Sequence, residues 1–365
     1  MTTPRLRSTS DAVDAGRLLT LVDAFAKTRV VVFGDLIVDE FIYGELSRVS
    51  REAPVLILDY DSTDIVPGGA GNAASNVAAL DARPAAVGVA GRDDTGRRLL
   101  DVMRRHVNVG GVVRPAGYRT PTKTRILAGG VHSAKQQVVR IDRATRPTYS
   151  DADRRTIESR LARACAGADA LIVSDYGTGL VTPAAVARAR GRLKRRSGTR
   201  APLLVDSRYA LLRFRGMTAC TPNESEVEHL LGIRIGDNLR ILERAGRELL
   251  ARTRSQAVLV TRGSRGMALF ERDRPTIHIR IFGSDQIADV TGAGDTVIAT
   301  MTLAVAAGGS FYEASRLANY AGGLVVMKRG TATVSPAELR DAVLNDHYAP
   351  AEPWSQEGPS QGRGR

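Results

Sequence analysis

The chain has 365 residues, a length that suits about two domains, or one large α/β domain with a small insertion. Apolar residues make up 43% and charged residues 25%, which argues against disorder throughout, a collagen-like fibre and a coiled coil. The net charge of +13 raises nucleic acid, lipid and anionic small molecules as partners. Much of this excess is local, because ten lysines and arginines lie within residues 186–215, which we interpret as a solvated basic face.

The two cysteines, Cys165 and Cys220, are too few for a disulfide framework or a cysteine-rich metal site. No signal-peptide pattern is visible, and no apolar run approaches the roughly 18 to 20 residues of a membrane span. We therefore expect a cytoplasmic protein without a membrane partner.

Apolar runs and helical patterns alternate along most of the chain, after an amphipathic helical pattern at 12–26. The runs that predict buried parallel strands are 29–33, 85–91, 168–176, 202–206 and 257–263. The helical patterns lie near 70–82, 93–107, 151–166, 182–196, 224–231 and 238–252. This alternation predicts an α/β fold with a central, mostly parallel sheet flanked by helices.

Residues 40–60 and 112–142 instead alternate polar with apolar side chains around turn signals, which predicts a small antiparallel β lid. Exposed strand edges and apolar faces in this lid predict a homodimer that pairs across it. The chain then divides into an N-terminal extension (1–28), one body (29–348) and a disordered tail (349–365) rich in Pro, Gly, Ser and Gln.

The sequence DVTGAGD at 289–295 precedes an apolar helical run. The backbone N–H groups of Gly292, Ala293 and Gly294 would lie unpaired at the start of that helix and form an anion hole. Asp295, in the first turn, could accept a proton from a hydroxyl beside a bound phosphate, which suits phosphoryl transfer. The alternative is that Asp295 only caps a glycine-rich turn.

A second glycine cluster, VPGGAGN at 66–72, lacks the pattern of a dinucleotide fingerprint or a P-loop. Gly68, Gly69 and Asn72 could offer a polar surface to a polyhydroxylated ligand, or form a structural turn. Asp35 and Asp39 follow the first predicted strand, where carboxylates can accept hydrogen bonds from sugar hydroxyls.

The sequence TPNESE at 221–226 marks a junction between a strand and a helix. Asn223 and Glu226 could hold a hydrated magnesium ion near phosphates. The same spacing is that of a capping box, and both interpretations can hold together.

These motifs, in this order, resemble the ribokinase-like (phosphofructokinase B type) sugar kinases. Within them, GDLIVDEFIYG (34–44), SRVSREAPV (47–55), LIVSDYGTGL (171–180) and GTATVSP (330–336) resemble the heptose 7-phosphate kinases of ADP-heptose synthesis. The resemblance covers residues 28–345 and implies a ribokinase-like fold. No H-x-G-H motif of the nucleotidyltransferase often fused to these kinases is present, so we expect a stand-alone kinase.

The resemblance implies an ATP- and Mg²⁺-dependent kinase that phosphorylates the anomeric hydroxyl of D-glycero-D-manno-heptose 7-phosphate to give the 1,7-bisphosphate. Asp295 would be the general base, and Asn223 and Glu226 would act through Mg²⁺. The residues implied along the nucleotide are Thr261, Gly263, Gly266 and Asn319, where Asn319 has a structural role as its alternative. Those implied around the sugar are Asp35, Asp39, Gly68, Gly69 and Asn72.

The phosphate of such a substrate needs cations, and Lys123, Arg125 and Arg140 on the lid strands are the candidates. Their alternative is a solvated strand face. The chain departs from the family twice, with Gly177-Thr178-Gly179 where a Lys-Gly pair is expected and Asp206-Ser207-Arg208 in place of Asp-Pro-Lys. We expect residues near Asp175 and Asp206 to line the site.

Three other functions stay open at this stage. The first is a kinase of the same family that acts on a different sugar or sugar phosphate. The second is a nucleic-acid-binding protein, suggested by the charge, but the low aromatic content of 5% and the lack of zinc-ligand spacing argue against nucleic acid as a partner. The third is a non-catalytic sugar-binding protein.

Overall fold

The computed structural model describes residues 14–129, 135–143, 149–196, 199–283, 290–328 and 330–346. The predicted disordered tail, 349–365, lies outside these ranges, as do residues 1–13 of the N-terminal extension and Asp289 of the DVTGAGD motif.

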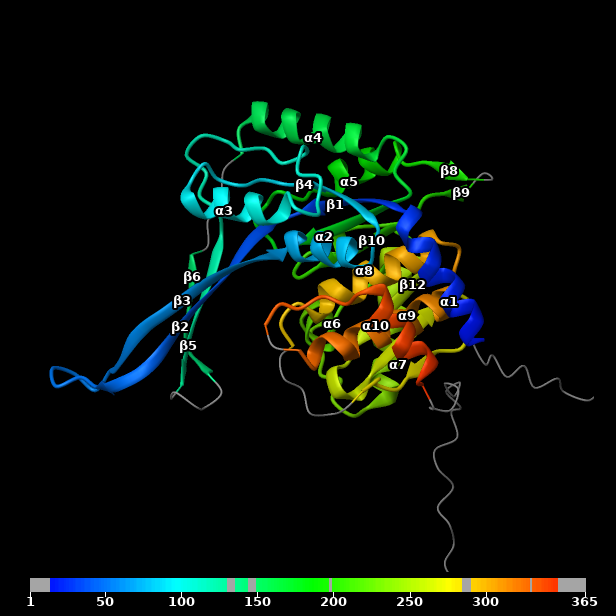
Figure 1. Cartoon of the computed structure of the whole chain (residues 1–365). Helices are drawn as coiled ribbons and strands as arrows, with labels where there is room; N and C mark the ends of the chain where they lie inside the picture. Colours follow the sequence, from blue (N-terminus) through cyan, green and yellow to red (C-terminus); the bar gives the residue numbers. More distant parts are fainter. Residues whose placement is uncertain are drawn as a thin grey trace, which may run out of the picture.

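The body is built on an eight-stranded sheet with the order β14-β13-β12-β11-β10-β7-β1-β4 (Figure 1). Its strands are β1 (Arg29–Gly34), β4 (Arg83–Val87), β7 (Ala170–Asp175), β10 (Leu203–Ser207), β11 (Ala219–Cys220), β12 (Ala257–Thr261), β13 (Met267–Glu271) and β14 (Ile277–Ile279). The strands from β4 to β12 are parallel, and β13 and β14 add an antiparallel edge. The predicted mostly parallel sheet is confirmed.

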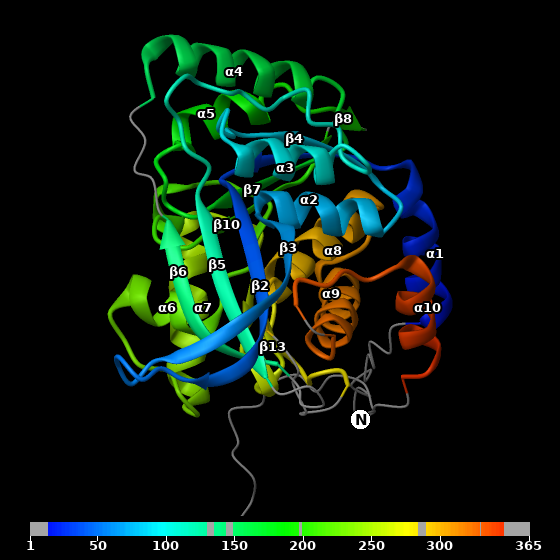
Figure 2. The same cartoon turned by 60° about the vertical axis from the view of Figure 1, so that its left-hand side comes forward.

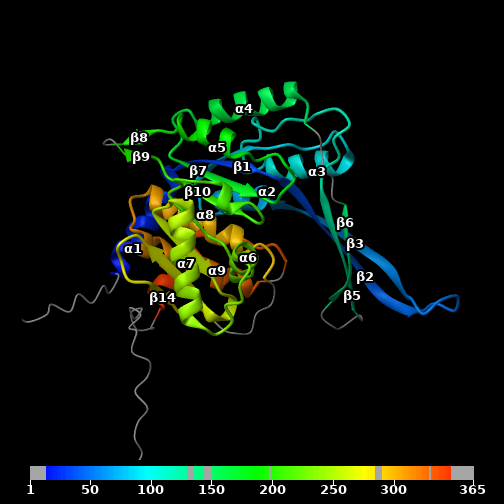
Figure 3. The ribbon, with the colours of Figure 1, turned by 180° about the vertical axis from the view of Figure 1, so that it is seen from behind.

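Helices cover both faces of this sheet, because alternate strand residues point to opposite sides. In β1, Val30 and Val32 join one apolar core, whereas Val31 and Phe33 join the other. The first face carries α1 (Ala15–Ala24), α2 (Ala70–Ala79), α3 (Asp94–Met103), α8 (Ala293–Ala306), α9 (Phe311–Val326) and α10 (Pro336–Leu344). The second carries α4 (Asp151–Cys165), α5 (Pro183–Arg190), α6 (Glu224–Leu231) and α7 (Leu239–Thr253), and Figure 3 shows α7 over it.

Two details of these helices differ from or extend the sequence analysis. The helix predicted at 182–196 ends at Arg190, because Gly191 occupies its C-cap and the chain then enters a short hairpin of β8 (Arg195–Arg196) and β9 (Thr199–Arg200). In α1, Leu18, Leu21 and Val22 are buried within the first core, so this helix packs onto the body.

The lid is a four-stranded sheet with the order β3-β2-β5-β6. Its strands are β2 (Leu36–Val49), β3 (Leu56–Gly69), β5 (Thr122–Gly129) and β6 (Gln136–Arg143). Each hairpin is antiparallel, as predicted, and a parallel pair of β2 with β5 joins the two. Residues 112–121 run outside the strands. The β2–β3 hairpin projects far from the body, as Figures 1 and 2 show.

Within the described ranges, no helix has both the length and the apolar character that crossing a membrane requires.

Candidate active site

A polar cavity of about 330 Å³ lies where the carboxyl ends of the parallel strands meet the lid and the start of α8. Parallel sheets place their ligand sites at this edge, because the loops that follow the strands converge there. The predicted residues that line it are Asp39, Gly69, Asn72, Lys123, Arg125, Arg140, Asn223, Glu226, Thr261, Gly292, Gly294 and Asp295. The motifs that the sequence analysis singled out are therefore brought together from distant parts of the chain.

Helix α8 begins at this cavity. Gly292 occupies the N-cap with φ 82°, in the left-handed region, and a Cβ there would lie 2.5 Å from Nδ2 of Asn72. Glycine therefore permits both the turn and the close approach of α2. The Ala293 N–H donates to the Val290 carbonyl at 3.3 Å, and Ala293 faces a neighbouring cavity, so Gly292 and Gly294 are the predicted anion-hole residues that face the polar one.

Asp295 is buried, with 4% of its surface exposed. Its Oδ2 accepts a hydrogen bond from Nδ2 of Asn72 at 2.8 Å, and its Oδ1 has no hydrogen-bond partner among the described residues. Burial raises the pKa of Asp295 to about 7; the bond from Asn72 and the charge of Lys123 lower it, and the charge of Asp39 raises it further. A carboxylate with a pKa near neutrality in the lining of a polar cavity has the properties of a general base.

Asn72 is itself held by a chain of hydrogen bonds that the sequence analysis missed. Nδ2 of Asn76 donates to Oδ1 of Asn72 at 3.1 Å, and Oγ1 of Thr296 donates to Oδ1 of Asn76 at 2.8 Å. The chain links α2 to α8 and fixes the amide of Asn72 so that its N–H points to Asp295. The four-residue spacing of Asn72 and Asn76 is the signal that could have revealed it.

The three predicted cations of the lid lie in the cavity but differ in their partners. Arg125 forms an ion pair with Asp39, and Arg140 makes two hydrogen bonds to Asp142, at 2.7 and 2.6 Å. Lys123 has no carboxylate partner among the described residues, and its Nζ lies 5.1 Å from the centre of the Tyr176 ring. Burial lowers the pKa of Lys123, and the charge of Asp39 opposes this effect.

Asp35 does not line the cavity, unlike Asp39. Its two oxygens accept hydrogen bonds from the Tyr176 N–H at 2.8 Å and from the N–H and hydroxyl of Thr178. Burial raises the pKa of Asp35 to about 6, and the bonds from Thr178 oppose this effect. Thr178, one of the departures from the family pattern, thus occupies the carboxylate that the sequence analysis assigned to the sugar. Gly68 lies behind Asp39: a Cβ there would meet Oδ2 of Asp39 at 2.3 Å.

Asn223 and Glu226 form the capping box of α6, with both reciprocal hydrogen bonds at 2.9 Å. Glu226 also faces Asp206 across the cavity. Burial and the charge of Glu226 raise the pKa of Asp206 well above its usual range, and burial raises that of Glu226. These acids, together with Asp175, create a region of negative potential that a cation would relieve, and residues near Asp175 and Asp206 do line the cavity.

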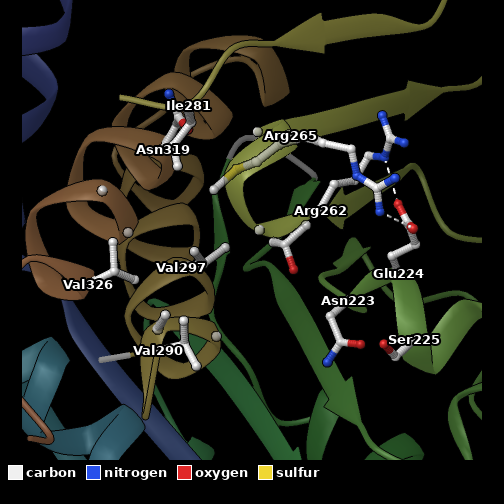
Figure 4. A pocket seen from close by; sticks show the side chains of 18 residues that line it. Asn223, Glu224, Ser225, Arg262, Arg265, Ile281, Val290, Val297, Asn319 and Val326 are labelled. Carbon is white, nitrogen blue, oxygen red and sulfur yellow. Dashed lines mark hydrogen bonds and ion pairs between the residues drawn. The ribbon is translucent and has the colours of Figure 1, made fainter. Parts of the chain in front are cut away.

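A second cavity, of about 550 Å³, adjoins the first (Figure 4). The predicted nucleotide residues Thr261, Gly263, Gly266 and Asn319 all line it. Its walls include the apolar side chains of Ile281, Val290, Val297 and Val326, most of which the sequence analysis did not identify. The cavity suits an aromatic base, and Asn319 is fixed at its edge by a hydrogen bond to the Arg280 carbonyl at 2.8 Å.

Arginines border the opposite side of this second cavity. Glu224 forms ion pairs with the buried Arg262, at 2.8 Å, and with Arg265, as the dashed lines in Figure 4 show. Asn223, Thr261 and Gly294 line both cavities, so the two meet beside the start of α8. A base and its phosphates can therefore extend from the apolar cavity to the carboxylate of Asp295.

A polar cavity and an apolar cavity that meet at a helix start, beside a buried carboxylate, are an arrangement that suits transfer of a phosphoryl group to a hydroxyl. The sequence comparison identifies the class: residues 27–338 match the pfkB family carbohydrate kinases, and the chain belongs to that family. The predicted ribokinase-like sugar kinase is thus confirmed.

Curated relatives include the bifunctional protein HldE of Caulobacter vibrioides, 40% identical over 340 residues, which are 92% of this chain and 67% of that protein. HldE of Geobacter metallireducens is 40% identical over 311 residues, or 85% of this chain and 61% of the relative. The chain thus spans about two thirds of the length of these relatives.

Solved structures show the same fold. Phosphofructokinase-2 from Escherichia coli in complex with potassium has a TM-score of 0.68 at 18% identity and covers 87% of this chain and 98% of its own. Arabidopsis thaliana ribokinase complexed with ribose and ATP has a TM-score of 0.60 at 21% identity and covers 87% of this chain and 97% of its own.

Proposed function

We propose that this sugar kinase transfers the γ-phosphoryl group of ATP to the anomeric hydroxyl of D-glycero-D-manno-heptose 7-phosphate. The observation that carries the proposal is Asp295, buried in the lining of the polar cavity and held by Asn72, directly after Gly294, which lines both cavities. The motifs at 34–44, 47–55, 171–180 and 330–336, which resemble those of heptose 7-phosphate kinases, support a heptose phosphate as the substrate.

In this reaction the sugar lies in the polar cavity and ATP in the apolar one. Asp295 accepts the proton of the anomeric hydroxyl as the sugar oxygen bonds to the γ-phosphorus and the bond from that phosphorus to ADP breaks. The N–H groups of Gly292 and Gly294, at the positive end of the α8 dipole, stabilise the charge of the phosphoryl group in transfer.

The donor set at the junction fits a hydrated magnesium ion rather than an all-protein metal cage. No group of three or more His, Cys, Asp or Glu side chains arranged for a metal occurs in the described ranges. Glu226 and Asn223 are partly engaged with each other, which leaves them able to hold Mg²⁺ through water, as Mg²⁺ bound to phosphates prefers. When bound, the ion would neutralise the phosphates of ATP.

The lid strands supply the charge that would recognise the 7-phosphate. Of the three lid cations, Lys123 is the one that has no carboxylate partner in the described part of the chain, so we assign it the main contact. Arg125 and Arg140 would reorient from Asp39 and Asp142 or add to the positive potential around that phosphate.

The test is an assay of ADP release from Mg-ATP with a panel of hexose and heptose phosphates. We expect turnover with D-glycero-D-manno-heptose 7-phosphate, and ³¹P NMR of the product should show a second phosphate, on the anomeric carbon. Turnover with another sugar only would assign a different substrate to the kinase. An absence of turnover with every sugar and sugar phosphate would favour a non-catalytic sugar-binding protein.

A further inference from the structure

Arg208, the last residue of the Asp206-Ser207-Arg208 departure from the family pattern, is a cation in the lining of the polar cavity. It directly follows β10, where the Arg208 N–H donates to the Asp175 carbonyl at 3.0 Å, and Oγ of Ser207 donates to the Asp175 carboxylate at 2.7 Å. Its backbone is therefore fixed at the carboxyl edge of the sheet. The side chain extends from there into the lining of the cavity.

The guanidinium of Arg208 lies over the ring of the next residue, Tyr209, at 5.7 Å from the ring centre. The Tyr209 ring in turn packs on Gly177, where a Cβ would come within 2.9 Å of it, and meets His229 edge-on at 6.3 Å. Gly177 has φ +83°, a conformation that favours glycine as well. Contacts with Gly177 and His229 thus hold the Tyr209 ring, and the ring orients the planar guanidinium of Arg208.

The guanidinium of Arg208 makes no hydrogen bond or ion pair with another side chain in the described ranges, in contrast to those of Arg125 and Arg140. Its neighbours across the cavity are carboxylates: its charge lowers the pKa of both Asp206 and Glu226, against the effect of their burial. It is therefore a cation with unused donors in the lining of the polar cavity, near Lys123 and near Glu226, whose capping-box partner Asn223 lines both cavities.

We infer that Arg208 is a catalytic residue whose guanidinium, oriented by Tyr209, contacts the phosphoryl group in transfer. The inference rests on the proposed function, because it places that group at the junction of the two cavities. An arginine can donate two parallel hydrogen bonds to phosphate oxygens, and these charge-assisted bonds are stronger than bonds between neutral groups. Arg208 would also offset the carboxylates that otherwise repel an anionic acceptor.

The test compares Arg208→Ala, Arg208→Lys and Tyr209→Leu with Arg213→Ala, which removes an exposed arginine on the same segment that does not line the cavity. In Arg208→Ala we expect kcat to fall by about 10²- to 10³-fold, with the KM values for ATP and sugar phosphate within about threefold of the wild type. Arg208→Lys should recover part of kcat, and Tyr209→Leu should lower kcat less than Arg208→Ala does. Arg213→Ala should match the wild type.

A binding measurement separates this inference from the identity of the sugar. Calorimetry would compare the affinity of each protein for Mg-ADP alone and for Mg-ADP with aluminium fluoride, which imitates the phosphoryl group in transfer. Wild type and Arg213→Ala should gain affinity with the fluoride, and Arg208→Ala should lose most of this gain while binding Mg-ADP normally.

Two results would overturn the inference. One is a raised KM for the sugar phosphate at unchanged kcat, which would place Arg208 on the phosphate of the acceptor. The other is an undiminished gain from aluminium fluoride in Arg208→Ala. If the wild type phosphorylates no sugar phosphate, the proposed function fails, and the calorimetry still decides the role of Arg208.

Discussion

At the scale of single residues, the environment of Asp295 favours catalysis over stability. A buried carboxylate with a pKa near 7 is destabilised in its charged form, the form needed to accept a proton. Hydrogen bonds from the side chains of Asn72 and Tyr176 lower this pKa, against the larger effect of burial.

Asp295→Asn should therefore abolish most turnover and stabilise the fold. We expect kcat to fall by about 10²- to 10⁴-fold, because the amide cannot accept the proton, while Mg-ATP binds normally. The pKa of Asp295 is raised from the usual 3.8 to about 7 in the folded protein, so its charge costs stability that grows from about pH 4 and reaches on the order of 4 kcal/mol above pH 7. Thermal unfolding should show a higher midpoint for the variant at pH 8 and little difference near pH 4. A variant with full activity would place the base elsewhere.

The raised pKa of Asp295 also predicts the pH dependence of the wild type. Below pH 7 the carboxylate is increasingly protonated and cannot act as a base, so kcat/KM should fall about tenfold per pH unit there. Lys123→Ala removes a charge that lowers this pKa, so its profile should shift to higher pH. The measurement is kcat/KM for the sugar phosphate from pH 5.5 to 9 at saturating Mg-ATP, and a flat profile across pH 7 would contradict the assignment.

Single residues differ in how far the sequence could reveal them. Some site residues belong to short contiguous motifs whose residue types already indicate their chemistry, namely Asp295, Gly292 and Asn72. The structure places them together. The stack of Arg208 on Tyr209 depends on β10 lying beside β7, with Ser207 opposite Asp175, and no local pattern encodes that neighbour. The hydrogen bonding of the Asp35 carboxylate likewise depends on Thr178, which is 143 residues away in the chain.

At the scale of elements, the hairpin of β2 and β3 positions the sugar side of the site. Gly68 lies opposite Ile37 in this pair, and its lack of a side chain leaves space for the Asp39 carboxylate that pairs with Arg125. The glycine cluster that suggests a ligand loop thus ends a strand and then opens α2.

Gly68→Ala should move Asp39, because the new Cβ would lie 2.3 Å from its Oδ2. We expect the KM for the sugar phosphate to rise about tenfold, or ~1.4 kcal/mol of binding, with the KM for ATP unchanged. Gly16→Ala is the matched control, since its Cβ would meet only ordinary contacts of 3.4 Å. Steady-state kinetics with each substrate varied in turn would check this, and an equal rise in both KM values would argue against a local effect on Asp39.

Elements with a strong periodic pattern could be predicted, and those defined by tertiary pairing could not. The apolar runs correspond to β1, β4, β7, β10 and β12. Strands β13 and β14 were missed because their pattern is short and they form the antiparallel edge of the sheet, where β13 pairs with β12 and β14 with β13. The parallel pairing of β2 with β5 joins two hairpins that are far apart in the sequence. The alternation of polar and apolar residues within each strand does not reveal which distant strand it pairs with.

At the scale of the whole molecule, body and lid have different surfaces. The body buries continuous apolar cores on both faces of its sheet, whereas the lid leaves large apolar side chains exposed. Those on the lid are Leu46, Val49, Val55, Leu56, Tyr60, Val138, Val139 and Ile141. Apolar residues clustered on one projecting sheet indicate a surface that another protein covers, whereas scattered ones need no explanation.

We propose that the lids of two chains pair as a homodimer across this apolar surface. The projecting hairpin carries Val49 opposite Leu56, so its exposed residues form cross-strand pairs that a second copy can bury. In a two-fold dimer the same apolar patch of each chain covers that of the other, so both patches are buried together. The mass of a single chain is 39.1 kDa, and light scattering after size exclusion should therefore give the wild type twice that mass.

The double variant Val49→Glu with Leu56→Glu places like charges in this pair and should shift the protein to monomer at micromolar concentration. Leu344→Glu, on an equally exposed residue of α10 far from the lid in sequence, should leave the dimer intact. Because Lys123, Arg125 and Arg140 lie on strands of the same sheet, loss of pairing should also raise the KM for the sugar phosphate. A monomeric wild type, or a double variant that stays dimeric, would show that the lid is covered in another way.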